Sequence, residues 1–328
     1  MRAIETIKNI WKIEDLRKRI ITTILLVLVY RAGTYVVLPG IDPQFLTQLR
    51  AQTSGGLMQL LDMFSGGAFS NASIFALGIM PYITASIVIQ LLGMALPYFQ
   101  KLQREGESGR RKLNQYTRYL TVFILLIQGP TYLVNLSVQM GGAFPTDILF
   151  TISSTIILTA GSMFIMWLGE RITDRGIGNG ISFIILVGII ARLPFAFFAE
   201  LTSRVSQQGG GLVAFLIEII LLFFVFCGTI LLVQGTRKVP VQYAKRVVGR
   251  KMYGGQTNYI PIKVAMSGVM PIIFASSITS IPNMIASFWP PKTAFWTAVA
   301  NAFRYDSWIY AILYFLLIIA FNYFYVAI

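Results

Sequence analysis

Long apolar runs alternate with short charged segments along the whole chain. Eight of these runs are about 20 residues long, the length that carries an α-helix across about 30 Å of hydrocarbon. Bounded by charges or by Gly/Pro clusters, they lie near residues 20–38, 73–96, 119–138, 148–169, 181–200, 212–234, 264–288 and 308–328. A soluble core cannot absorb so many apolar segments, so the pattern predicts an all-α polytopic membrane protein with about eight transmembrane helices.

The composition agrees with a lipid environment and disfavours several kinds of enzyme. Hydrophobic residues make up 55% of the 328 residues and charged residues only 12%, whereas soluble domains are about a quarter charged. The chain has no histidine, and its single cysteine, Cys227, lies inside an apolar run. Disulfide, zinc and His-dependent hydrolase chemistry are therefore disfavoured. The sequence contains no GxxxxGKS/T phosphate loop, and we expect no catalysis, no metal and no cofactor.

The basic residues are distributed so that they orient the chain in a membrane. The net charge is +14, and most of the 27 Lys and Arg residues fall in four segments, 1–19, 97–118, 170–180 and 235–263, which lie on one side of the membrane. By the positive-inside rule, this side is the cytoplasm. We expect residues 1–19 to form an amphipathic cytoplasmic amino terminus that is not a removable signal peptide, because no small-residue cleavage site follows the first apolar run.

Two of the cytoplasmic segments are longer and more basic than orientation alone requires. One is 101–118, and the other is 237–263, which contains Arg237, Lys238, Lys245, Arg246, Arg250 and Lys251. Both could dock a large polyanion such as ribosomal RNA through phosphate contacts. A surface that touches anionic lipids would have the same composition, so both alternatives stay open.

The segment between the first two runs is interrupted in an unusual way. Met58 to Phe64 is apolar but too short to span, and Ser65, Gly66 and Gly67 follow it directly. Gly-rich apolar pieces lie at membrane depth only where protein or a water-filled cavity covers their backbone. The segment is therefore either a short re-entrant helix that fills a cavity or an amphipathic helix on the outer surface.

Single residues within the runs indicate where the helices bend and where partners are needed. Pro81 is expected to kink the second span, and Arg31 in the first span needs a polar partner or an aqueous cavity. Two isoleucine pairs, Ile79 with Ile83 and Ile185 with Ile189, have the four-residue spacing of one helical face. By spacing alone, such pairs are usually ordinary packing or lipid contact.

Several long motifs give the chain a specific resemblance to a known family. The motifs are YRAGTYVVLPGID (30–42), LDMFSGGAFSNASIFALGIMPYITASIVIQLL (61–92), GERITDRGIGNGISFIILVGI (169–189) and GVMPIIFASSI (268–278). In sequence and in order they resemble the SecY family, the channel subunit of the bacterial Sec protein translocase. The resemblance covers nearly the whole chain.

The resemblance implies a SecY-type inverted-repeat helix bundle around an hourglass pore in the bacterial cytoplasmic membrane. Residues 20–200 would form the first five-helix half, 201–211 an external connection, and 212–328 a second half of three helices with the basic loop 235–263. The family has ten spans. The chain as given would therefore lack the last two spans and would be incomplete at its carboxyl end.

The same resemblance assigns roles to particular residues. Residues 57–71 would be a plug that closes the outer funnel, with Leu57, Leu60, Leu61, Met63, Phe64, Ser65, Gly66 and Gly67 among its members. The apolar constriction would comprise Ile79, Ile83, Ile185, Ile189 and Ile273. A polar contact that keeps a lateral gate closed would involve Thr84, Gln128, Ser276 and Ser277.

The implied activity is passive conduction of proteins across the membrane and their lateral insertion into it. The implied partners are the small membrane subunits SecE and SecG, the ribosome or the SecA ATPase, signal sequences, nascent polypeptides and anionic lipids. The basic loop between the sixth and seventh spans would belong to the docking surface. Two alternatives remain, a secondary transporter of a small solute and a scaffold that inserts membrane helices without conducting soluble chains.

Overall fold

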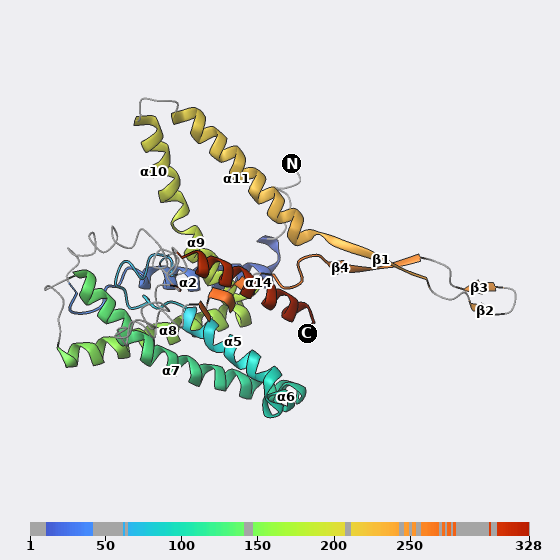
Figure 1. The fold of residues 1–328 in the computed structure, drawn as a ribbon, viewed down its shortest axis with the longest axis horizontal. Coiled ribbons are helices and arrows are strands. Elements are labelled where there is room, and N and C mark those ends of the chain that lie inside the picture. Colours follow the sequence, from blue (N-terminus) through green and yellow to red (C-terminus); the bar gives the residue numbers. More distant parts are fainter. Residues whose placement is uncertain are drawn as a thin grey trace. The chain divides into compact units, whose positions relative to one another are not determined.

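Helices dominate the protein in a computed structural model, which describes residues 11–41, 62, 65–140, 147–206, 211–242, 246–248, 251–253, 257–268, 271–272, 274–276, 278–279, 302 and 307–327. The helices, coloured from blue to red along the chain in Figure 1, are α2 (Glu14–Gly33), α5 (Met80–Ala95), α6 (Pro97–Arg104), α7 (Glu107–Met140), α8 (Ile148–Arg175), α9 (Gly180–Ile190), α10 (Leu193–Ser206), α11 (Gly211–Gln234) and α14 (Trp308–Ala327). The prediction of a helical polytopic protein is confirmed.

Among the described residues, five helices are long and apolar enough to cross a membrane. They are Glu107–Val138, Ile148–Arg175, Gly180–Arg204, Val213–Gln234 and Trp308–Ala327. A sixth candidate is the pair Met80–Gly93 and Pro97–Arg104, whose axes are bent by 98°. The first predicted run forms α2, which ends at Gly33 and so covers only part of 20–38, and most of the run 264–288 lies outside the described residues.

The chain divides into two compact units. The first comprises Met1–Ala196 and Ile281–Ser307, and the second comprises Phe197–Ser280 and Trp308–Ile328. In the first unit, α5 packs against α7, α7 against α8, and α8 against both α2 and α9. The short helix α6 contacts both α5 and α7.

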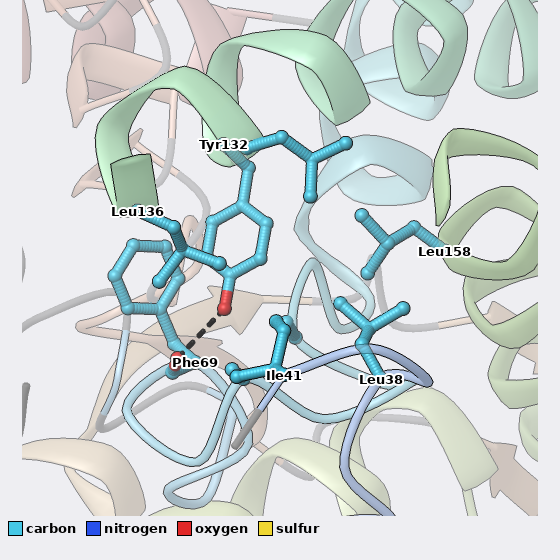
Figure 2. Packing of buried hydrophobic residues seen from close by; sticks show 9 residues of the cluster. Leu38, Ile41, Phe69, Tyr132, Leu136 and Leu158 are labelled. Carbon is cyan, nitrogen blue, oxygen red and sulfur yellow. Dashed lines mark hydrogen bonds between the residues drawn. The ribbon is translucent and has the colours of Figure 1, made fainter. Parts of the chain in front are cut away.

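An apolar cluster in the first unit joins α7 and α8 to two irregular segments (Figure 2). Its buried members are Leu38, Ile41, Phe69, Ala72, Ala76, Tyr132, Leu133, Leu136 and Leu158. The rings of Phe69 and Tyr132 meet edge to face, with centroids 4.8 Å apart. This geometry is favourable for aromatic pairs, and it fixes the segment around Phe69 against α7.

The second span starts later than its apolar run predicts. Residues 65–79 consist of turns and one isolated β-bridge, α5 begins at Met80, and Pro81 lies in the first turn of that helix. N–H groups in the first turn of a helix have no intrahelical partner, so a proline there removes no hydrogen bond. The expected kink at Pro81 is therefore wrong, because this proline helps to begin the helix.

The basic segment 101–118, expected as a loop, is mostly helical. It comprises the end of α6 and the start of α7, with only Glu105 and Gly106 between the two helices. Gly106 has φ +74°, a left-handed conformation that favours glycine and allows this sharp turn. The apolar run 119–138 is thus one part of the longer helix α7.

In the second unit, the basic segment after α11 is a β-ribbon. Strand β1 (Thr236–Gln242) pairs antiparallel with β4 (Thr257–Lys263), and β2 (Arg246–Val248) pairs with β3 (Lys251–Tyr253). Figure 1 shows β1 and β4 running side by side. The sequence reading expected only a loop at 235–263, so these four strands are an addition to the predicted helical fold.

Candidate functional site

The segment immediately before α5 is buried although it is not helical. Residues 65–73 are all buried, and the turns within them require positive φ at Gly66 (+66°) and Gly67 (+90°). The backbone of residues 72–74 pairs with that of residues 36–38, through Leu38 N to Ala72 O at 2.9 Å and Ile74 N to Val36 O at 3.0 Å. We call residues 62 and 65–79 the anchored segment.

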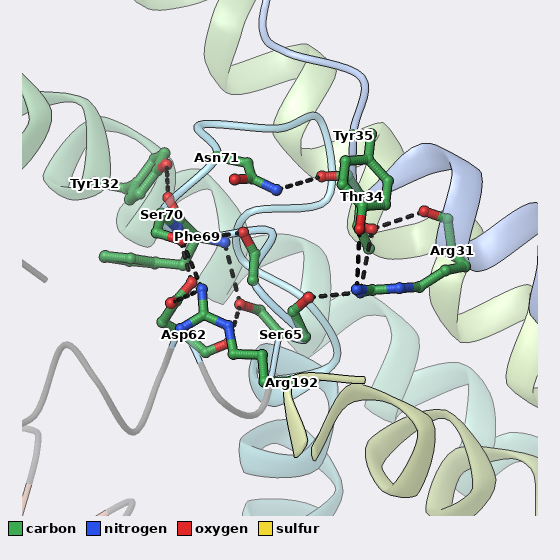
Figure 3. A network of polar contacts seen from close by, with 12 residues as sticks. Arg31, Thr34, Tyr35, Asp62, Ser65, Phe69, Ser70, Asn71, Tyr132 and Arg192 are labelled. Carbon is green, nitrogen blue, oxygen red and sulfur yellow. Dashed lines mark hydrogen bonds and ion pairs between the residues drawn. The ribbon is translucent and has the colours of Figure 1, made fainter. Parts of the chain in front are cut away.

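Arg31, from the last turn of α2, holds one side of the anchored segment (Figure 3). Its Nη1 donates a hydrogen bond of 2.6 Å to the carbonyl of Gly66, and its Nη2 lies 3.3 Å from the hydroxyl of Tyr35. A guanidinium inside a span is costly unless it finds acceptors. The predicted need of Arg31 for a polar partner is therefore confirmed, and the partner is a backbone carbonyl.

Arg192, from the turn between α9 and α10, holds the opposite side (Figure 3). Its Nη2 forms an ion pair with Asp62 and donates a hydrogen bond of 2.8 Å to the hydroxyl of Ser70. The Asp62 side chain is only 2% exposed, and its second oxygen accepts from Ser70 N at 2.8 Å. A buried carboxylate is tolerated only when it is paired and hydrogen-bonded in this way.

Neutral side chains satisfy further backbone groups of the same region. The hydroxyl of Tyr30 donates to the carbonyl of Ser65 (3.2 Å), and the hydroxyl of Tyr132 donates to that of Phe69 (2.9 Å). Non-helical backbone at membrane depth requires such partners, because lipid offers none. The described part of the interrupted segment is accordingly covered by protein.

Of the residues assigned to the plug, only those toward its carboxyl end are largely among the residues that the structure describes. Ser65, Gly66 and Gly67 lie in the buried turns, whereas five of the assigned plug residues lie outside the described residues, namely Leu57, Leu60, Leu61, Met63 and Phe64. The choice between a re-entrant helix and a surface helix for 57–64 therefore stays open. What the structure adds is an anchor on the carboxyl side of that piece.

Four of the five constriction isoleucines are described. Ile79 and Ile83 are 3% and 9% exposed and are one helical turn apart at the start of α5, where Ile83 N donates to Ile79 O at 3.1 Å. Ile185 and Ile189 are half-buried on α9. Ile273 lies outside the described residues. Their role as a constriction stays a prediction.

The four lateral-gate residues also stay a prediction. The Thr84 hydroxyl donates to the Met80 carbonyl of its own helix at 3.1 Å. Gln128 on α7 and Ser276 in the second unit are half-buried, and Ser277 lies outside the described residues.

Among the predicted docking residues, Arg237 and Lys238 are exposed on β1, opposite Ile262 and Pro261 of β4. Arg246 pairs with Tyr253 and Lys251 with Val248 in the second ribbon, and Lys245 and Arg250 lie outside the described residues. The docking role itself remains untested by this geometry.

The sequence analysis identified neither Asp62 nor Arg192 as a site residue. A signal was present, because an acidic residue inside an apolar run and an arginine inside the predicted span 181–200 both require partners. No local spacing relates residues 62 and 192. Only the fold brings them together.

Comparisons with known proteins agree with this architecture. The profile of the SecY family matches residues 73–328. Protein translocase subunits SecY of Streptomyces galbus and of Escherichia coli K12 are 43% and 42% identical to this chain, over 96% and 95% of its length and over 74% and 72% of theirs. The SecY subunit of Thermotoga maritima is 42% identical over 98% of this chain and 74% of its own.

Two solved structures share the fold. A structure described as that of a protein-conducting channel matches with a TM-score of 0.66 at 17% identity, over 94% of this chain and 71% of that one. Sec61 in the canine ribosome–channel complex from the endoplasmic reticulum matches with a TM-score of 0.57 at 16% identity, over 83% and 58%. The fold is that of a protein-conducting channel. By profile and by identity, the chain belongs to the SecY family of protein translocase subunits.

Proposed function

We propose that the chain forms the passive pore of a Sec translocase in the bacterial cytoplasmic membrane, with its amino terminus in the cytoplasm. Two inverted halves, 20–200 and 212–328, would surround the pore. Isoleucines 79, 83, 185, 189 and 273 would form its constriction, and residues 57–71 would plug it at rest. A narrow aliphatic ring resists ion leakage because it binds ions poorly and dewets, yet flexible side chains conform to any polypeptide.

The observation that supports this proposal best is the continuity between the anchored segment and the isoleucines. The anchored segment shares Asp62 and residues 65–71 with the proposed plug, is held there by Arg31 and Arg192, and leads directly into Ile79 and Ile83. Arg192 in turn follows Ile189 by three residues. One anchored region thus overlaps the proposed plug and adjoins two of the three isoleucine-bearing segments.

The partners in this proposal supply what the chain itself lacks. We infer that the ribosome or the SecA ATPase provides the driving force, and that neither chemical catalysis nor a cofactor is needed in this chain. The basic ribbon of β1 and β4 would contact that partner, with ribosomal RNA as one target and anionic lipid nearby. SecE and SecG would complete the membrane complex.

Signal sequences and nascent membrane helices would leave the pore sideways. We propose a gate between the second and third spans on one side and the seventh and eighth on the other, closed by polar contacts of Thr84, Gln128, Ser276 and Ser277. An apolar signal helix would replace these contacts with its own surface. Interhelical polar contacts in membranes are weak, about 0.6 kcal/mol on average, so they can hold a gate without locking it.

Deletion of residues 57–71 tests the proposed function. In the translocase reconstituted into planar bilayers, we expect the deletion to raise the resting ion conductance, while a secretory precursor is still translocated. A transporter would lose solute uptake and gain no conductance. An unchanged resting conductance in correctly assembled complexes would overturn the proposal.

A further inference from the structure

The ion pair between Asp62 and Arg192 connects a residue of the proposed plug to the turn that follows α9, the helix that carries two of the proposed constriction isoleucines. Arg192 lies in the two-residue turn between α9 and α10, and Ile185 and Ile189 belong to α9. Asp62 lies within residues 57–71, the proposed plug. A displacement of the carboxyl end of α9 must therefore act on Asp62 through the guanidinium of Arg192.

Arg192 contacts residues at both ends of the stretch from Asp62 to Ser70. Its Nη2 reaches Asp62 and, at 2.8 Å, the hydroxyl of Ser70, and a methyl group added at Gly67 would lie 3.2 Å from the same nitrogen. The guanidinium therefore contacts Asp62 and Ser70 (Figure 3) and lies close to Gly67. A close backbone approach accompanies it, since a methyl group at Gly66 would lie 3.0 Å from Cα of Gly188 on α9.

Arg31 and Arg192 hold the segment by different chemistry. Arg31 donates to the neutral carbonyl of Gly66, which no side-chain substitution at residue 66 removes. Arg192 binds a carboxylate that is almost fully buried, while its own side chain is 43% exposed. If Arg192 withdraws, Asp62 is left as an uncompensated buried charge, so the paired state is strongly preferred.

We propose that Asp62 and Arg192 are positioning residues, a latch that keeps the plug seated until the constriction widens. This rests on the proposed function above. When an entering polypeptide spreads the constriction, α9 moves, Arg192 leaves Asp62, and the plug is released to move outward. When the polypeptide has passed, return of α9 restores the pair and reseats the plug. Without the latch, the unseated state gains population at rest.

A double-mutant cycle in the assembled translocase tests the latch. We expect Arg192→Gln to raise the resting ion conductance by about tenfold or more, as loss of a charge-assisted contact predicts. Asp62→Asn should raise it less, because the amide keeps the acceptor for Ser70 N. In the double variant, we expect no further increase over Arg192→Gln, because both changes remove the same contact.

The same variants should also translocate a precursor with a weakened signal sequence better than the wild type does, which a purely structural role would not produce. Arg192→Lys keeps the charge and should stay near the wild-type conductance. The matched control is the exposed pair Glu107–Arg111 on α7, whose N···O distance is 2.7 Å; Arg111→Gln should leave conductance unchanged.

Several results would overturn the latch. One is a wild-type resting conductance in Asp62→Asn and Arg192→Gln complexes that assemble normally, and another is multiplicative effects in the double variant. If deletion of 57–71 raises the resting conductance while these variants do not, the latch proposal is wrong and the proposed role of 57–71 as a plug is retained. If the deletion has no effect, the proposed function itself fails.

Discussion

The Nη1 atom of Arg31 lies 2.6 Å from the carbonyl oxygen of Gly66 and donates a hydrogen bond to it across 35 residues of sequence. This contact joins α2 to a turn whose backbone would otherwise face an apolar environment. The ring of Tyr35 lies beneath the same guanidinium, 5.2 Å from its carbon to the ring centroid. Both contacts stabilise a cation within a membrane protein.

Replacement of Arg31 should therefore destabilise the first unit. We expect Arg31→Ala to lower the stability of the detergent-solubilised complex by about 1–3 kcal/mol, because the Gly66 carbonyl loses a charged donor. Thermal unfolding followed by tryptophan fluorescence measures this. Arg110→Ala, a change in an exposed arginine on α7, is the control, and equal shifts in the two variants would refute the role of Arg31.

Removal of the Tyr132 hydroxyl should lower the stability of the protein, although it removes only one atom other than hydrogen. Tyr132→Phe keeps the edge-to-face contact with Phe69 but removes the hydroxyl donor of the buried Phe69 carbonyl, which then keeps only the hydrogen bond from Ala72 N at 3.2 Å. We expect a loss of about 1–2 kcal/mol, again measured by thermal unfolding. Tyr119→Phe, at a side chain that is 70% exposed, should have no effect; no loss in Tyr132→Phe would contradict the account.

Alanine substitutions at two glycines with left-handed backbones distinguish the cost of backbone strain from the cost of a steric clash. Gly66 and Gly106 both have positive φ, +66° and +74°. A methyl group at Gly66 meets the backbone of Gly188 at 3.0 Å, whereas nothing lies within 4 Å of one at Gly106. Gly106→Ala should cost about 1–2 kcal/mol from strain alone, and Gly66→Ala should cost more.

The measurement for this pair is the midpoint of thermal unfolding of each assembled variant. The resting conductance adds a second readout, which should rise for Gly66→Ala only. Equal effects of the two substitutions on both readouts would show that the approach of residue 66 to α9 is unimportant.

The basic ribbon offers a test of the proposed docking surface. We expect Arg237→Glu with Lys238→Glu to weaken co-sedimentation of the translocase with ribosomes, or its binding of SecA, by tenfold or more, and the wild-type binding to fall as salt rises. Lys12→Glu with Lys18→Glu reverses the same charge at two exposed residues outside both candidate docking segments and is the control. If the control pair weakens binding as much, the ribbon is not the preferred contact.

Most of the helices could be predicted from the sequence, because an apolar run long enough to cross the lipid must form a helix. An uninterrupted run such as 212–234 must be helical to satisfy its backbone, and α11 covers almost the same residues. Where the run contains glycine and small polar residues, as at 73–79, the rule is weaker. Burial by α7 and α8 then stabilises turns in place of a helix.

The candidate site was less accessible to sequence reasoning. The sequence predicts that Arg31 needs a polar partner, because a charge inside a span is costly. Its partner is a backbone carbonyl, which every residue has, so the partner could not be identified from residue types. Asp62 and Arg192 are 130 positions apart, and no periodicity connects them. The motif at 61–92 identified the family through its residues, whereas the ion pair depends on tertiary contacts alone.

The most direct test of the central claim is photocrosslinking of a secretory precursor arrested in the assembled translocase. A photoreactive amino acid replaces Ile79, Ile185 or, as control, Ile156, an isoleucine on α8 that is 59% exposed. We predict that the precursor is crosslinked from 79 and 185, while 156 labels lipid. Labelling of lipid alone from 79 and 185 would contradict the account, because these isoleucines would then face acyl chains and not the path of the polypeptide.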